Sequence, residues 1–350
     1  MRVILTHEQE RRLILALLTG MGVKPEQAEV TAEVLTEGDL RGFSSHGLLR
    51  LPYILRALRR GTIVAEAEVR VVRERGAAAV LDGGHGLGHF AAKRAMELAV
   101  EKARGFGVGA VGVVNSNHFG IAGYYAEIAV RSGMIGIVCT TTDALVHPWG
   151  GVEPILGTNA LAVGIPAEPV PIVLDMAMSN AARGKIVQAL KEGRSIPPDW
   201  AIDEEGNPTT DPARALKGAL SPFGGVKGYA LALVLEILAG PLVGAEAGRK
   251  VVGTLEPVEG FCTKGDLMLA LDPAAFTDAG EFSRKVKEFI LEVKGSRKAR
   301  GVEEILLPGE PEMRTRERRL REGIPISEEV WREVEGWARE LGVDLREILR

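Results

Sequence analysis

The sequence predicts an α/β protein with helices at both ends and strands alternating with helices between them. Three observations support this fold class. Apolar residues recur at helical spacing over residues 6–60, short apolar runs bounded by glycine fill residues 69–271, and helical spacing returns over residues 282–341. The chain has 350 residues, of which 46% are apolar, so it is long enough for more than one domain with a real core.

Charge and cysteine content exclude several classes of protein. The net charge of −4 and the pI near 6.0 provide no basic field for nucleic acid or an anionic membrane. Cys139 and Cys262 form no CxxC pair, so we expect neither a disulfide framework nor a metal site. The longest apolar stretch, residues 230–239, is too short to span a bilayer and contains Glu236. We therefore expect a cytoplasmic protein, and the scarcity of Asn and Gln is typical of a thermophile.

Three helices are predicted before Gly61. Thr6 and Gln9 form a capping box for the first helix, and Pro25 begins the second. Gly42 breaks the second helix, so that Ser44 or Ser45 is expected to cap the third.

The stretch from Arg41 to Arg50 brings hydroxyls, an imidazole and a guanidinium close together in the chain. On a helix that begins near Ser45, His46 and Arg50 would lie on one face, where the helix dipole favours an anion. An imidazole that exchanges protons beside a guanidinium suits a 2-oxo or 2-hydroxy acid. Taken alone, the stretch favours a simpler interpretation, with a capping serine, a surface histidine and a solvated arginine.

A glycine-rich turn between two strand-like runs and the helix predicted over residues 90–104 resembles a dinucleotide-binding fingerprint. The spacing fails, because Gly84 and Gly86 would need a third glycine where His89 stands. The next strand ends in Asn115 and not in the acidic residue that would hold a ribose. We therefore exclude a Rossmann domain, and interpret His85 as part of a polar turn and His89 as a first-turn helix residue.

Polar side chains follow two of the buried strands. His118 comes after the strand predicted over residues 108–114, at a position typical of α/β ligand sites, and is either a ligand or a turn residue. Asp175 ends an apolar strand and is either a binding carboxylate or the cap of a helix that begins at Ser179 or Asn180.

The second half of the chain contains fewer chemical signals. Residues 193–225 are rich in turn-forming residues and predict a long loop, and Lys227, between glycines at a helix start, can hold a phosphate or carboxylate. Residues 261–271 predict a strand, and amphipathic helices follow over residues 282–293 and 330–341. Residues 314–321 alternate in charge and predict a solvated helix face.

Several motifs, individually weak, together cover nearly the whole chain. They are Ser44 to Gly47 with Arg50, Asn115 to Gly120, Thr158-Asn159, Leu174 to Ala177 with Ala182 to Lys185, Gly224 to Tyr229, and Pro308 to Glu310. In these motifs the chain resembles the type 2 malate/L-lactate dehydrogenase family, which includes sulfolactate, ureidoglycolate and diketogulonate enzymes and cyclic-imine reductases.

The resemblance implies a non-Rossmann NAD(P)-binding domain on a mixed, largely antiparallel sheet, together with a helical domain built from both chain ends. The expected divisions are residues 1–70 for the N-terminal helical part, 71–278 for the cofactor domain, and 279–350 for the helices that return. It also implies a homodimer with its sites near the subunit interface.

The resemblance further implies the roles of individual residues. His46 and His118 match the positions assigned as acid/base in different members, Ser45 and Asp175 match a relay to the first histidine, and Arg50 matches a substrate-carboxylate position. The matched cofactor contacts are His118, Thr142, Asp175, Met176, Ala177, Lys227, Pro308, Gly309 and Glu310. Met178 departs from the family, because many members carry threonine there.

The implied activity is hydride transfer between nicotinamide and a 2-hydroxy or 2-oxo acid, with malate or L-lactate as the expected substrate and NAD or NADP as the cofactor. Two alternatives stay open. One is a reductase of a cyclic imino acid or a diketo sugar acid, and the other is a catalytically silent dimer that binds nicotinamide cofactors.

Overall fold

A seven-stranded mixed sheet forms the centre of the protein in a computed structural model, which describes residues 2–255 and 258–350. In spatial order the strands are β2 (Arg70–Arg75), β3 (Ala78–Asp82), β4 (Val108–Val114), β10 (Asp266–Leu271), β5 (Ile135–Thr140), β6 (Leu161–Ile165) and β7 (Ile172–Met176). Only β3 and β4 run parallel, and every other neighbouring pair is antiparallel. This arrangement confirms the mixed, largely antiparallel sheet and the exclusion of a Rossmann domain.

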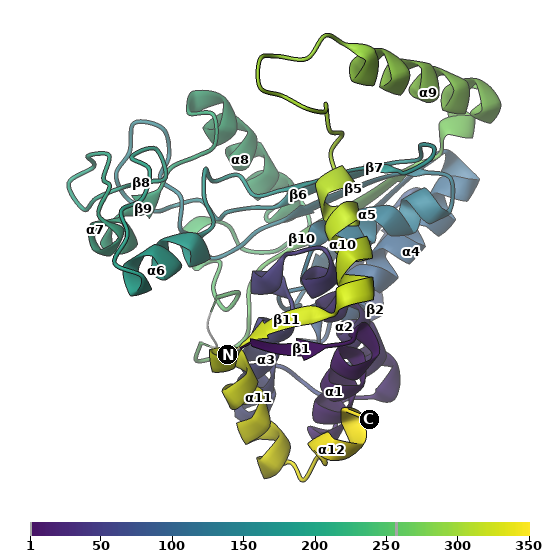
Figure 1. Cartoon of the computed structure of the whole chain (residues 1–350). Helices are drawn as coiled ribbons and strands as arrows, with labels where there is room; N and C mark the ends of the chain where they lie inside the picture. Colours follow the sequence, from purple (N-terminus) through teal and green to yellow (C-terminus); the bar gives the residue numbers. More distant parts are fainter. Residues whose placement is uncertain (1, 256–257) are drawn as a thin grey trace.

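Helices cover the two faces of this sheet (Figure 1). Helices α4 (Gly88–Phe106) and α5 (Ala122–Arg131) pack on one face through small residues such as Ala95 and Ala99. Helix α8 (Val226–Ala239) packs on the other face. Neighbouring residues of β10 face opposite sides of the sheet. Met268 belongs to the apolar core beneath α4 and α5, and Leu267 belongs to the core beneath α8.

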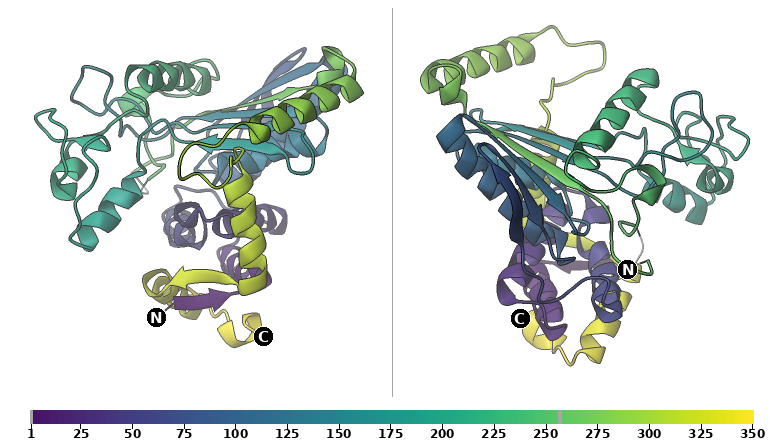
Figure 2. Two further views of the ribbon diagram at one scale, coloured as in Figure 1. Left: turned by 45° about the horizontal axis from the view of Figure 1, so that its top comes forward. Right: turned by 180° about the vertical axis from the view of Figure 1, so that it is seen from behind.

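The helical part is built from both ends of the chain. Strand β1 (Arg2–Leu5) pairs with β11 (Ile324–Ser327) in antiparallel fashion, and the first and last segments lie side by side in Figure 2. Around this pair one apolar core joins five helices, namely α1 (His7–Gly20), α2 (Pro25–Leu40), α3 (Leu51–Arg60), α11 (Glu328–Glu340) and α12 (Leu345–Ile348). The capping box of Thr6 and Gln9 is present.

In the chain, two long helices come between β10 and β11. Helix α9 (Ala279–Gly295) extends away from the sheet, and α10 (Glu310–Glu322) returns to the helical part (Figure 2). None of the helices in the described ranges is long and apolar enough to cross a membrane. The domain limits at residues 70 and 278 stay a prediction.

Two predictions of local structure in residues 193–271 are wrong. The long loop predicted over residues 193–225 contains β8 (Ala201–Ile202), α7 (Pro212–Lys217) and β9 (Ala219–Leu220), which form a small lobe beside α6 (Arg183–Lys191). The strand predicted from Phe261 begins only at Asp266. Before it the chain turns away, because the N–H of Thr263 donates to Val252 and its hydroxyl donates to the carbonyl of Lys250.

Candidate functional site

The loop that carries His46 follows α2 directly. After Gly42, whose φ of +92° ends the helix, the chain forms two short 3-10 turns, Ser44–His46 and Leu48–Arg50. The prediction of one α-helix capped by Ser44 or Ser45 is therefore wrong. Gly47, with a φ of −102° and a ψ of −141°, separates the two turns, and Pro52 favours a helix that begins at Leu51.

Ser45, His46 and His118 come together in space. The Ser45 hydroxyl lies 2.8 Å from Nδ1 of His46. The rings of His46 and His118 have their centroids 5.3 Å apart, although the two residues come from different parts of the fold. Arg50 lies close enough for its charge to act on both imidazoles, and its guanidinium stands 5.6 Å from the ring centroid of Tyr53.

The orientation of His118 is set by the loop after β4. The N–H of Gly120 lies 3.2 Å from Nδ1 of His118. A backbone amide can only donate, so Nδ1 must accept, and the neutral ring carries its proton on Nε2. Tight packing fixes this loop, because a Cβ atom on Gly88 would lie 1.9 Å from the carbonyl oxygen of Asn117.

Both imidazoles are uncharged at neutral pH. Burial and then the charge of Arg50 lower the pKa of His46 to about 4. Burial, followed by Arg50, His46, His89 and Lys264, holds the pKa of His118 well below its usual range.

Two further side chains, His89 and Lys264, belong to the same site. We define the histidine cluster as His46, His89 and His118 with Arg50 and Lys264. His89 does lie in the first turn of α4, but it is only 1% exposed, and neither ring nitrogen meets a partner among the described residues. Burial and then the charge of Lys264 lower its pKa to about 3. Lys264 is itself buried, pairs with Asp266 and lies 4.5 Å from the ring centroid of Phe119.

Sequence reasoning missed Lys264 and underestimated His89. A signal for Lys264 exists, because Lys264 and Asp266 are charged residues inside the apolar run of residues 261–271, where an unpaired charge would be costly. No comparable signal exists for His89, since only the packing of α4 against residues 117–120 shows that its ring is enclosed.

Asp175 lies at the end of β7 and is not a member of the histidine cluster. Its Oδ2 accepts the N–H of Gly123 at 2.7 Å, at the first turn of α5. The alternative in which Asp175 caps the next helix is wrong, because α6 begins at Arg183 and is preceded by Ala182. Burial raises the pKa of Asp175 to about 6, against the opposing effect of the Gly123 hydrogen bond.

A cavity of about 360 Å³ opens beside Asp175. Pro308 and Gly309 line it from the other side, and the Pro308 carbonyl accepts the N–H of Val173 at 3.0 Å. Gly309 has a φ of +94° and packs against Val173, so this wall needs glycine for its conformation and its close approach. The structure therefore brings together three of the predicted cofactor residues, Asp175, Pro308 and Gly309.

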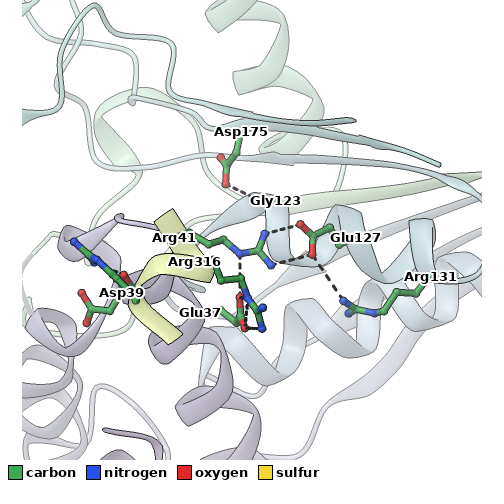
Figure 3. A network of polar contacts seen from close by, with 9 residues as sticks. Glu37, Asp39, Arg41, Gly123, Glu127, Arg131, Asp175 and Arg316 are labelled. Carbon is green, nitrogen blue, oxygen red and sulfur yellow. Dashed lines mark hydrogen bonds and ion pairs between the residues drawn. The ribbon is translucent and has the colours of Figure 1, made fainter. Parts of the chain in front are cut away.

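A carboxylate–guanidinium cluster lies next to this cavity (Figure 3). Arg41 donates to both oxygens of Glu127, at 2.5 and 2.9 Å, and its Nε donates to Glu37 at 3.1 Å. Arg316 of α10 also donates to Glu37. The predicted solvated face of residues 314–321 is thus partly wrong, because Arg316 joins α10 to α2.

The other predicted cofactor residues are distributed more widely. The Thr142 hydroxyl accepts the N–H of Thr158 at 2.9 Å, Met176 and Ala177 continue the chain after Asp175, and Lys227 is exposed in the first turn of α8. The carboxylate of Glu310 accepts from Lys294 and from the N–H of Leu307, so it holds the turn that contains Pro308. The relay from Asp175 to His46 stays a prediction.

The site thus contains a paired hydroxyl and imidazole, a second imidazole with a defined tautomer and a nearby guanidinium, which are groups that can exchange protons with a small anion. A family model described as malate/L-lactate dehydrogenase matches residues 5–335, and the chain belongs to this family of oxidoreductases.

The similarity to known members extends over the whole chain. It is 50% identical to an L-sulfolactate dehydrogenase of Methanothermobacter thermautotrophicus over 338 residues, 97% of each chain. The sulfolactate dehydrogenase structure from Methanocaldococcus jannaschii is 46% identical, with a TM-score of 0.95 and 99% of both chains covered. The malate dehydrogenase structure from Pyrococcus horikoshii is 38% identical, with a TM-score of 0.89 over 98% of this chain and 97% of that one.

Proposed function

We propose that the protein is a NAD(P)-dependent dehydrogenase that interconverts a 2-hydroxy acid and its 2-oxo acid, and that its substrate has a second anionic group, as malate and sulfolactate do. The observation that carries this proposal is the convergence of the Ser45–His46 pair, His118 and Arg50 at one place. Oxidation of an alcohol needs an acceptor for the hydroxyl proton, and the reverse reaction needs a donor for the ketone.

His46 is the better acceptor of the two histidines. When its Nδ1–H donates to Ser45, its Nε2 has a free lone pair that can take the proton of the substrate hydroxyl. His118 carries its proton on Nε2, because Gly120 occupies Nδ1, and so it can donate a hydrogen bond to the substrate oxygen but cannot take a proton there. We therefore assign proton exchange to His46 and orientation of the substrate oxygen to His118.

Arg50 has a second effect besides holding the substrate carboxylate. In the free protein its charge helps to keep the pKa of His46 at about 4, which makes the imidazole a weak base. A carboxylate bound to Arg50 offsets that charge and raises the pKa of His46 toward the working pH, where proton transfer is most efficient.

The charges around the site favour a substrate with two anionic groups. Arg50 and Lys264, the latter paired with Asp266, both oppose protonation of the imidazoles. A dianion offsets more of this positive charge when an imidazole takes up a proton than a monoanion such as lactate does. Relatives named for sulfolactate and malate support this choice. Of the two substrates that the sequence predicts, malate and L-lactate, we therefore favour malate, and we add sulfolactate.

The cavity beside Asp175 fits one ring of a nicotinamide cofactor. A Cβ atom on Gly123 would lie 3.1 Å from Oδ2 of Asp175, so glycine keeps this side open and leaves the carboxylate undisturbed. Asp175, Pro308 and Gly309 would hold the cofactor there, and the nicotinamide supplies or accepts the hydride when bound. Relatives are named for NADP(+) and for NAD(+), and we expect NAD as the first choice with NADP as the alternative.

We also propose that two copies of the chain associate. Helix α8 leaves large apolar side chains in solvent, including Val226, Val234 and Ile237, each at least half exposed. Such a face is typical of a subunit interface. Light scattering after gel filtration should give the mass of a dimer, and Ile237→Lys should shift it toward the monomer.

The experiment that tests the activity follows nicotinamide absorbance with purified protein. NADH and NADPH are each offered with oxaloacetate, sulfopyruvate, pyruvate, a cyclic imino acid and a diketo sugar acid. Oxidation with the first two, well above that with pyruvate, supports the proposal. Oxidation only with the imino or diketo acid selects the alternative reductase, and binding of NADH without any turnover selects the silent dimer.

A further inference from the structure

Two carboxyl groups are buried together behind the loop that carries His46. Glu10 of α1 is 0% exposed, and neither of its carboxyl oxygens meets a partner of good hydrogen-bond geometry among the described residues. Asp39, near the end of α2, is 2% exposed and is the acidic neighbour of Glu10. Two ionised carboxylates in such a place would repel each other without water to screen them.

Asp39 is bonded directly to the loop. Its Oδ2 accepts the N–H of Leu48 at 2.6 Å, between His46 and Arg50 in the chain. Gly47 packs so closely that a Cβ atom there would lie 2.0 Å from the same oxygen. Arg319 of α10 donates to the backbone carbonyl of Asp39, so α10 also helps to hold Asp39 in place.

We propose that Glu10 and Asp39 hold one proton between them and act as positioning residues for the loop that carries His46. The proton resides mainly on Glu10, and the ionised Asp39 accepts the N–H of Leu48. The role of the loop in catalysis rests on the proposed function, whereas the shared proton does not.

The groups around Glu10 and Asp39 favour a proton on Glu10 and a negative charge on Asp39. Glu10 faces Asp39 and the charge of Arg319, and burial raises its pKa well above the usual range. Asp39 faces Leu48, Glu10, Arg319 and Ser44, and these contacts oppose the rise that burial causes in its pKa. Donors therefore surround Asp39, which favours its ionised form, while Glu10 faces a carboxylate.

The first test locates the proton. Glu10→Gln is compared with wild type and with Glu8→Gln, an exposed position on the same helix, by urea unfolding from about pH 5 to about pH 9. The unfolded chain loses the Glu10 proton near its ordinary pKa but the folded protein keeps it, so wild type loses stability as the pH rises. The midpoint of Glu10→Gln should therefore rise relative to that of wild type as the pH increases, and Glu8→Gln should follow wild type. A constant difference would mean that Glu10 is ionised in the fold and would overturn the proposal.

The second test separates positioning from folding. Asp39→Ala removes the acceptor for Leu48, whereas Asp39→Asn keeps a carbonyl oxygen there. In folded protein, Asp39→Ala should lower kcat about ten- to hundredfold while the Kd for NADH changes less than about twofold, and Asp39→Asn should recover most of the loss. Equal kcat in the two variants would overturn the positioning role. Failure of wild type to turn over any substrate would refute the proposed function and leave the first test intact.

Discussion

Two polar clusters join the helical part to the sheet, and they differ in how their groups are satisfied. In the carboxylate–guanidinium cluster of Figure 3, Arg41 and Arg316 each meet carboxylates with good geometry. In the histidine cluster, cationic side chains face imidazoles, all three histidines have a lowered pKa, and His89 meets no partner among the described residues.

The difference separates the roles of the two clusters. Buried polar groups in folded proteins are nearly always paired, because an unmatched group loses its hydration without compensation. A cluster that is fully matched serves the fold. A cluster whose imidazoles are kept uncharged by burial and then by neighbouring cations is costly for the fold, and an arriving anion would relieve part of that cost.

The largest expected effect is on turnover when His46 is removed. His46→Ala should lower kcat by about 10²- to 10⁴-fold, the usual contribution of general acid–base catalysis. His118→Ala should cost less, because on our assignment it removes a hydrogen-bond donor and not the proton acceptor. Steady-state kinetics with the best substrate of the panel measures both.

His7→Ala is the control for these variants, because His7 lies at the start of α1 in the helical part and should leave kcat unchanged. A larger loss for His118→Ala than for His46→Ala would reverse the assignment. A small loss in both variants would remove proton exchange from the histidine cluster.

The second prediction concerns stability, to which the carboxylate–guanidinium cluster should contribute more than an exposed ion pair does. Arg41→Met removes both guanidinium hydrogen bonds to the buried Glu127 and one of those to Glu37, which keeps Arg316. It should lower the free energy of unfolding by about 3–5 kcal/mol. Arg284→Met on α9 breaks an exposed pair with Glu288 and should change it by less than about 1 kcal/mol. Urea unfolding of the three proteins makes the comparison, and an Arg41→Met variant as stable as wild type would contradict it.

Much of the fold could be predicted because its signals are local. The capping box of Thr6 and Gln9 and the failed glycine spacing at His89 each depend on a few neighbouring residues, and both conclusions hold in the structure. The loop at Ser44–Arg50 was placed correctly, but its conformation was not. Its two 3-10 turns depend on Gly47 packing against Asp39, which a helical pattern does not record.

The site itself could be predicted only in part, because its decisive contacts join distant segments. Nothing near His118 in the pattern shows that the amide of Gly120 fixes its tautomer. The pairing of Arg41 with Glu127 and the burial of Glu10 beside Asp39 likewise appear only once helices pack. Lys264 and Asp266, two charged residues inside an apolar run, are the one case in which the sequence carries a signal of a buried polar pair.

The third prediction concerns the affinity for substrate, with stability nearly unchanged. Arg50→Lys keeps the charge but loses the planar fork, so we expect a KM for the 2-oxo acid about tenfold higher, equivalent to one charge-assisted hydrogen bond of roughly 1.5 kcal/mol. The urea midpoint should hardly change, in contrast to Arg41→Met. An unchanged KM would remove Arg50 from the substrate site.

The smallest effect on activity is expected from Asp175, whose pKa of about 6 falls within the working range. If the ionised carboxylate is needed to hold the start of α5 and the cofactor, kcat/KM should rise several-fold as the pH increases through about 6. Asp175→Asn should give a low, flat profile through the same range. An inflection that persists in the variant would belong to another group.

The stability of the wild-type protein should move in the opposite direction to its activity. The folded pKa of Asp175 lies above its ordinary value, so its contribution to stability is present below that value and is lost as the pH rises through about 6. The full loss amounts to roughly 3 kcal/mol, and Asp175→Asn lacks it. Wild type should therefore become more active and less stable over one pH interval, while the variant changes in neither respect. A wild-type protein that gains both together would show that Asp175 is ionised in the fold at all these pH values.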